Sequence, residues 1–99
     1  MMTNINYDKD ADILKIIYAD EIEVPIVRTL TNGTVLDFDY QHNLLAISFP
    51  NFFKMMHRSP SNMIYGISLE GTQIIDRDVI FTFKIDDQLV NIKVDMKEL

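Results

Sequence analysis

The chain has 99 residues with 15 acidic and nine basic side chains, a formal net charge of −6, and no cysteine. Its length suits one small domain, and its charge argues against direct nucleic-acid binding, which depends on clustered lysine and arginine. The lack of cysteine excludes disulfides and thiol chemistry, and without an apolar run near the ~20 residues that span a bilayer we expect a cytoplasmic protein with no membrane association.

Two short strands are predicted at the start of the chain, over residues 5–7 and 13–18. The turn between them carries the carboxylates of Asp8, Asp10 and Asp12, which can accept hydrogen bonds from nearby backbone N–H groups. A third strand over residues 24–30 contains Pro25, which favours a sheet edge. The dipeptide Asn32-Gly33 then predicts a tight turn into the next strand.

Residues 34–49 alternate apolar and polar side chains on both arms of a predicted hairpin, with a polar turn at residues 41–43. This period of two is typical of half-buried strands. Asp37 and Asp39 are expected to face solvent. The predicted cross-strand pairs are Tyr40 with Leu45, Phe38 with Ile47, and Leu36 with Phe49.

A short helix is predicted over residues 52–58 with Asn51 as its N-cap, ended by Ser59-Pro60. A strand over residues 63–69, a turn at Glu70-Gly71 and a short element at residues 74–75 follow. The last hairpin repeats the layout of residues 34–49: Asp86 is expected to pair with Leu89 across a two-residue loop. We therefore predict a single domain over residues 1–99, with an additional hairpin portion at residues 63–96.

These elements define a mainly β, β-rich α+β fold. The expected architecture is an antiparallel sheet of hairpins that forms a small sandwich or open barrel, with one short helix across an open face.

A set of residues in the first half of the chain follows the order strand, acidic turn, strand, acidic hairpin and short helix. They are Tyr7, Asp8, Ala11, Asp12, Leu14, Ile16, Val35, Asp37, Asp39, Asn43, Leu44, Ile47, Asn51 and Lys54. This layout resembles the bacterial family called domain of unknown function 2283 over about residues 4–57. His42 replaces the usual turn glycine, and Lys15 replaces a common aromatic. The resemblance implies a small β-rich cytoplasmic protein without an established activity, and some members look like antitoxin-type partners of small toxin-like proteins.

Two groups of carboxylates are candidate sites. Asp8, Asp10 and Asp12 resemble the first ligands of a calcium loop, but Ile13 and Ala19 stand where that loop requires Gly and Glu. Asp37 and Asp39 could in principle act as an acid and base pair, although alternating charges on the exposed face of a hairpin are usual. We expect both groups to be structural, with no metal, cofactor or catalytic residue.

The segment from Phe52 to Met56 carries apolar side chains on more than one side of a helix. Phe52, Met55 and Met56 share one face, and Phe53 points elsewhere. Either both faces are buried, or part of the helix is exposed and binds another protein or a second copy.

For function we expect a protein-protein interaction module without enzymatic activity, with a basic partner or a second copy of the chain, and antitoxin-like neutralisation as its most concrete form. One alternative is a small enzyme or ligand-binding protein that uses the exposed carboxylates. Another is a phage or mobile-element inhibitor of a host nucleic-acid-handling protein.

Overall fold

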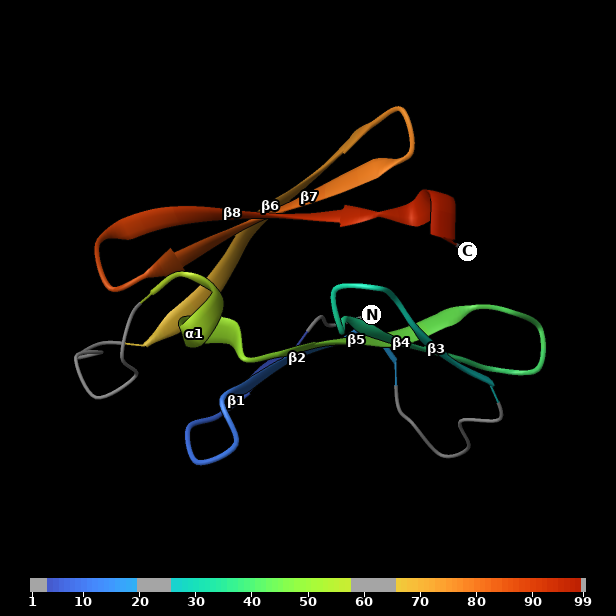
Figure 1. Ribbon diagram of the computed structural model, residues 1–99, viewed down its shortest axis with the longest axis horizontal. Helices are drawn as coiled ribbons and strands as arrows, with labels where there is room; N and C mark the ends of the chain where they lie inside the picture. The colour runs from blue at the N-terminus through green and yellow to red at the C-terminus, as the bar shows by residue number, and fades with distance from the viewer. Residues whose placement is uncertain (1–3, 20–25, 58–65, 99) are drawn as a thin grey trace. The chain divides into compact units, whose positions relative to one another are not determined.

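The computed structural model describes residues 4–19, 26–57 and 66–98. The chain divides into two compact units, Met1–Pro60 and Ser61–Leu99, and each contains one antiparallel sheet (Figure 1). The mainly β fold with one short α-helix is therefore confirmed for the described residues. Neither sheet closes into a barrel, because the strand order of each has two ends.

The first unit contains a five-stranded sheet in the order β1-β2-β5-β4-β3. Alternate side chains on its central strands are buried, among them Leu14, Ile16, Leu36, Ile47 and Phe49, as the period of two in the sequence predicts. Its strands are β1 (Asn4–Asp8), β2 (Ile13–Ile17), β3 (Ile26–Thr29), β4 (Val35–Phe38) and β5 (Leu44–Pro50).

The turn predicted at Asn32-Gly33 joins β3 to β4 and places β3 at the sheet edge. Gly33 has a φ of 94°, which glycine adopts without steric cost. The Asn32 side chain accepts a hydrogen bond from the Thr34 N–H at 3.0 Å. Pro25, from which the edge position was predicted, lies outside the described residues.

The hairpin of β4 and β5 has a different register from the predicted one. Leu36 lies opposite Ile47 instead of Phe49, and Phe38 lies opposite Leu44 after an irregularity between Asp37 and Phe38. Tyr40 is 65% exposed in the connecting loop and does not share the apolar face. At Leu36 the displacement is two residues, which preserves which side chains face inward, so alternation alone could not detect it. After the irregularity, Phe38 lies three positions from its predicted partner.

The second unit is a three-stranded meander in the order β6-β7-β8. The predicted turn at Glu70-Gly71 is wrong, because both residues lie inside β6, where the register shifts between Leu69 and Gly71. The chain turns instead at residues 76–77. Its elements are β6 (Ile67–Ile75), β7 (Asp78–Ile85), β8 (Gln88–Asp95) and a 3-10 turn, η2 (Met96–Glu98).

The last hairpin is also displaced by two residues from the expected register. Ile85 pairs with Gln88, so the two-residue loop is Asp86-Asp87 and the expected pair of Asp86 with Leu89 does not form. Asp86 has a φ of 53°, a backbone conformation that aspartate tolerates better than most residues. Alternate side chains still share one face of this hairpin: Phe81, Phe83, Ile85 and Val94 are buried.

The helix α1 (Phe52–Met55) is shorter than predicted, and the predicted end at residues 58–60 lies outside the described residues. Asn51 precedes the helix in a left-handed conformation, and its side chain makes no capping hydrogen bond. Asn51 therefore occupies the predicted N-cap position, but its side chain does not cap the helix. The cap comes from Asp12, which lies far away in the sequence.

Candidate functional site

The carboxylate of Asp12 is the cap of α1. It accepts hydrogen bonds from the Phe53 N–H at 2.9 Å and the Lys54 N–H at 3.2 Å, and from the Tyr7 hydroxyl at 2.7 Å. The Asp12 carbonyl accepts a further bond from the Phe52 N–H at 3.0 Å. These contacts satisfy N–H groups that the first turn of a helix leaves without an intrahelical partner.

The surroundings of Asp12 favour its charged form. Desolvation by partial burial raises its pKa, but the hydrogen bonds from Phe53, Tyr7 and Lys54 outweigh that effect and bring the pKa below its ordinary value. Asp12 is therefore held ionised as a structural anion, which is a poor state for a general acid.

Three aromatic rings surround this cap. The ring of Tyr7 lies 5.2 Å from that of Phe53 and 6.2 Å from that of Phe52, and the two phenylalanine rings are 5.5 Å apart and nearly perpendicular. Such edge-to-face contacts are favourable. Burial, together with the hydrogen bond to Asp12, raises the pKa of the Tyr7 hydroxyl.

The remaining carboxylates of the acidic loop do not converge. Asp8 accepts hydrogen bonds from the N–H groups of Asp10 and Ala11 at 3.0 and 3.2 Å, an arrangement typical of an Asx turn. Asp10 is exposed. Within the described part of the chain, no group of three or more acidic or histidine side chains is placed to hold a metal ion.

Asp37 and Asp39 likewise occupy different environments. Asp37 lies within β4, opposite Ala46 and Val27. Asp39 closes the following loop by accepting hydrogen bonds from the N–H groups of Asn43 and Gln41, both at 2.9 Å. The Asn43 N–H is the main cause of the lowered pKa of Asp39. The structure thus uses Asp39 as a turn-forming residue.

The helical segment considered as a protein-binding surface is mostly buried. Phe52 is fully buried and Phe53 is 1% exposed, whereas Met55 is 42% exposed and Met56 is half-buried. The two phenylalanines are therefore core residues of this structure. Of the four side chains, Met55 offers the most surface to another molecule.

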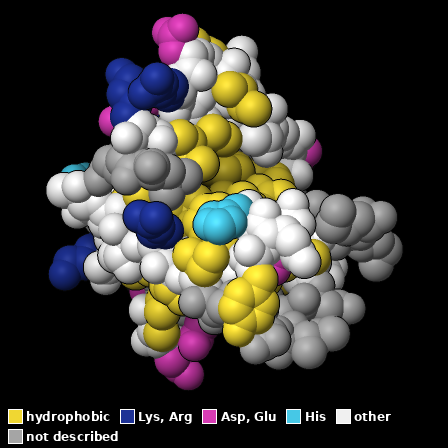
Figure 2. Space-filling view, turned by 90° about the vertical axis from the view of Figure 1, so that its right-hand side faces the viewer, with side chains coloured by type: hydrophobic (Ala, Val, Ile, Leu, Met, Phe, Trp, Pro, Cys, Tyr) yellow, Lys and Arg dark blue, Asp and Glu magenta, His cyan; other side chains and the backbone are white. Residues whose placement is uncertain are grey.

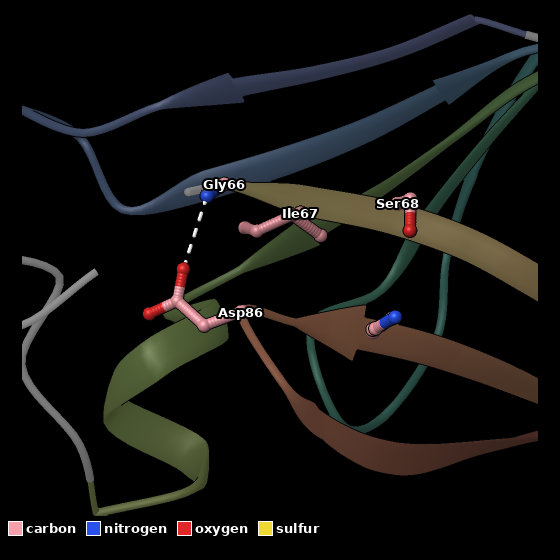
Figure 3. Close-up of a pocket in the computed structure, with 5 residues that line it drawn as sticks. Gly66, Ile67, Ser68 and Asp86 are labelled. Carbon is pink, nitrogen blue, oxygen red and sulfur yellow. Dashed lines mark hydrogen bonds between the residues drawn. The ribbon is translucent and has the colours of Figure 1, made fainter. Parts of the chain in front are cut away.

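A shallow hollow of about 170 Å³ lies at the start of β6, lined by Gly66, Ile67, Ser68, Lys84 and Asp86. Figure 3 shows the Asp86 carboxylate turned towards Gly66, whose N–H it accepts at 3.1 Å. The Gly66 carbonyl in return accepts the Asp86 N–H at 3.0 Å. The Ser68 hydroxyl donates to Glu70 at 3.0 Å. Among the described residues that line the hollow, the Ser68 hydroxyl has no basic partner that could activate it, and the two bonds between Gly66 and Asp86 join the start of β6 to the end of β7.

The outer edge of β6 is the strongest candidate for an interaction site. β6 is the first strand of its sheet and pairs only with β7 among the described strands. All residues from Glu70 to Ile75 are exposed. Ile74 is 72% exposed and Ile75 is 48% exposed, values that are uncommon for isoleucine in a strand. Figure 2 shows that apolar side chains also reach the surface on the face it displays.

The register tells which backbone groups of β6 are unused by the sheet. A two-residue loop is closed by a pair of residues that exchange both hydrogen bonds, and Ile75 and Asp78 form such a pair. Because bonding alternates along an antiparallel strand, Gln73 also bonds inward. The N–H and C=O groups of Thr72 and Ile74 therefore point away from β7.

The second loop of the meander leads to the same assignment. Ile85 and Gln88 close the Asp86-Asp87 loop, so Ile85 bonds to β8 and alternate residues of β7 bond to β6. Counting back along β7, Thr82 and Ile80 bond to their β6 partners Gly71 and Gln73. Thr72 and Ile74 again point outward.

The sequence does not predict this edge, because the composition of Glu70-Gly71 is typical of a turn. The signal that could have found it is the uncharged, β-favouring run Thr72-Gln73-Ile74-Ile75, which follows directly and ends at a polar turn. None of the described helices is long and apolar enough to cross a membrane. Comparisons with family models, curated proteins and solved structures found no match for this chain.

Proposed function

We propose that this chain is a non-enzymatic module that binds another protein, and that its partner is basic. The observation that carries the proposal is the exposed outer edge of β6. An unpaired strand edge is a template for the addition of another strand. The formal net charge of −6 favours association with a protein of opposite charge.

The edge lacks the usual protection over half of its length. Natural proteins shield strand edges with lysine, proline, bulges or very short strands. β6 has an irregularity at Glu70, but residues 71–75 contain no charge and no proline. The second half of β6 is therefore suited to accept a strand, and its two exposed isoleucines are suited to pack against one.

The alternative of a small enzyme or ligand-binding protein has less support. The carboxylates of Asp8, Asp12 and Asp39 each accept hydrogen bonds from the chain itself, which explains their presence without a substrate. An inhibitor of a host nucleic-acid-handling protein would use the same acidic surface, so it differs from antitoxin-like neutralisation in the identity of the partner. The resemblance to domain of unknown function 2283 and the cytoplasmic location stay predictions.

Affinity co-purification from the native cell tests the proposal. A tagged wild-type chain should retain a basic protein at low salt and release it as the ionic strength rises, since exposed charge pairs are screened. The matched control is the Ile74→Asp, Ile75→Asp double variant, which removes the apolar contact that the two isoleucines would make with the partner and should recover less of it. Recovery of no specific protein, together with any turnover of small molecules, would overturn the proposal.

A further inference from the structure

We infer that the partner segment is an extended strand with basic residues at both ends, which pairs antiparallel with residues 71–75 of β6. This inference rests on the proposed protein-binding function and deepens it by naming the site and the chemistry of its ligand. The site is the outward backbone of Thr72 and Ile74, together with the acidic residues that bound the uncharged segment.

The backbone of this segment supplies the hydrogen bonds. The N–H and C=O groups of Thr72 and Ile74 point away from β7, as both loops of the meander require. A strand added at this edge would satisfy four backbone groups without disturbing any bond that β6 makes to β7. Main-chain bonding of this kind provides affinity with little dependence on the ligand's sequence.

The side chains add selectivity. Glu70 and Asp76, both exposed, stand at the two ends of the uncharged segment, separated by about 20 Å at ~3.3 Å per residue. Asp78 is not free to contribute, because Lys93 lies 3.5 Å from its carboxylate. Two cations of the chain lie near these carboxylates in register or sequence. Lys84 lies opposite Ser68, two residues before Glu70, and Arg77 follows Asp76 in the turn. Lysine or arginine at the ligand's ends would meet the two carboxylates.

A second copy of the chain fits this edge less well. The two-fold antiparallel register that uses both outward residues is centred on Gln73 and places Thr72 of one copy opposite Ile74 of the other. The same register sets Glu70 against Asp76, which are like charges, twice per dimer. Each copy also carries a formal net charge of −6, so association of two copies is disfavoured.

The test uses two synthetic peptides with the same alternating valine and threonine centre, one with lysines and one with glutamates at its ends. The lysine peptide should bind the full chain at least about tenfold more tightly than the glutamate peptide at low salt. Its binding should slow amide hydrogen exchange at Thr72 and Ile74 more than at Ile80 and Thr82 on the central strand β7.

The matched variants are Thr72→Pro and Thr72→Val. Proline at this position removes an outward N–H and leaves the ladder to β7 in place, whereas valine keeps the backbone donor. We expect Thr72→Pro to lose peptide binding and Thr72→Val to retain it, with similar thermal midpoints. If the proline variant fails to fold, the hydrogen-exchange measurement on the wild type still tests whether the peptide binds at Thr72 and Ile74.

Four outcomes overturn the inference: no binding of the lysine peptide at about 1 mM, equal binding of both peptides, binding without protection of Thr72 and Ile74, or sedimentation of the chain as a dimer that Thr72→Pro dissociates. The last would make a second copy the occupant. If a cellular partner co-purifies equally well with Thr72→Pro, the edge is not the site but the protein-binding proposal stands.

Discussion

The Asp12 carboxylate lies 2.9 Å from the backbone nitrogen of Phe53, across 41 positions of sequence. Through this bond the turn between β1 and β2 fixes the start of α1, and the same carboxylate holds the Tyr7 hydroxyl. The acidic turn and the helix are thus one structural unit, with the aromatic rings of Tyr7, Phe52 and Phe53 packed around it.

Replacement of Asp12 by alanine should destabilise the fold by about 1–2 kcal/mol, the usual cost of losing a helix cap. Tyr7→Phe removes one of the bonds and should cost about 0.5–1.5 kcal/mol. The double variant should cost less than the sum of the two, because both remove the same hydrogen bond. Urea unfolding measures all three. Asp10→Ala is the control, and an equal loss there would refute the capping role.

The contribution of Asp12 should depend on pH below neutrality. Its hydrogen bonds lower its pKa in the folded chain relative to an ordinary value near 3.9. A lowered pKa means that the contribution is present above about pH 4 and is lost as the pH falls through the folded pKa. The stability gap between the wild type and Asp12→Asn should therefore be widest near pH 7 and shrink below about pH 4. A gap that stays constant down to about pH 2.5 would contradict this account.

The burial of Phe53 and the exposure of Met55 predict opposite outcomes for two neighbouring substitutions. Phe53→Ala should cost about 3–5 kcal/mol, as for other buried phenylalanines. Met55→Ala should change the free energy of unfolding by no more than about 0.5 kcal/mol. Thermal and urea denaturation measure both. If Phe53→Ala left the free energy of unfolding unchanged, the ring would have to be exposed in solution, and the helix would again be a candidate binding surface.

Two glycines of the second unit offer a matched pair. Gly66 has a φ of +117°, whereas Gly71 has no such constraint, and a Cβ at either position would meet nothing within 4 Å. Gly66→Ala should therefore cost about 1–3 kcal/mol through backbone strain alone. Gly71→Ala should be neutral or stabilise by up to about 1 kcal/mol, because alanine restricts the unfolded chain. Equal effects at the two positions would show that φ does not control the difference.

Alternation in the sequence predicted the antiparallel strands and which side chains they bury, because each inward residue sits at every second position. It failed to give the register of either hairpin, since a displacement by two residues leaves the inward set unchanged. The predicted turn at Glu70-Gly71 is wrong for another reason: an irregularity inside one long strand has the composition of a turn. Leu36 and Phe49 are therefore both buried, but they are not the cross-strand partners that the sequence predicts.

The candidate site was harder to predict than the fold. Asp12 was recognised as a hydrogen-bond acceptor of its own turn, but its partners lie 41 and 42 positions away, a distance over which no local pattern carries information. Asn51 stands immediately before the helix and is a residue type common at N-caps, so the local sequence favours Asn51 over Asp12 as the cap. The exposure of Ile74 depends on the position of β6 at the edge of its sheet. That position follows from the strand order of the meander and cannot be inferred from the residues next to Ile74 in the sequence.

The strand pairing of the described residues has a further consequence for errors in folding. β1 to β5 pair only with one another, and β6 to β8 do the same, so no backbone ladder couples the two sets. A slip of one residue in the meander would turn the ring of Phe83 to the other face of its sheet and leave the backbone hydrogen bonds of β2 and β5 in place. A change of register within one sheet therefore breaks backbone hydrogen bonds of that sheet alone.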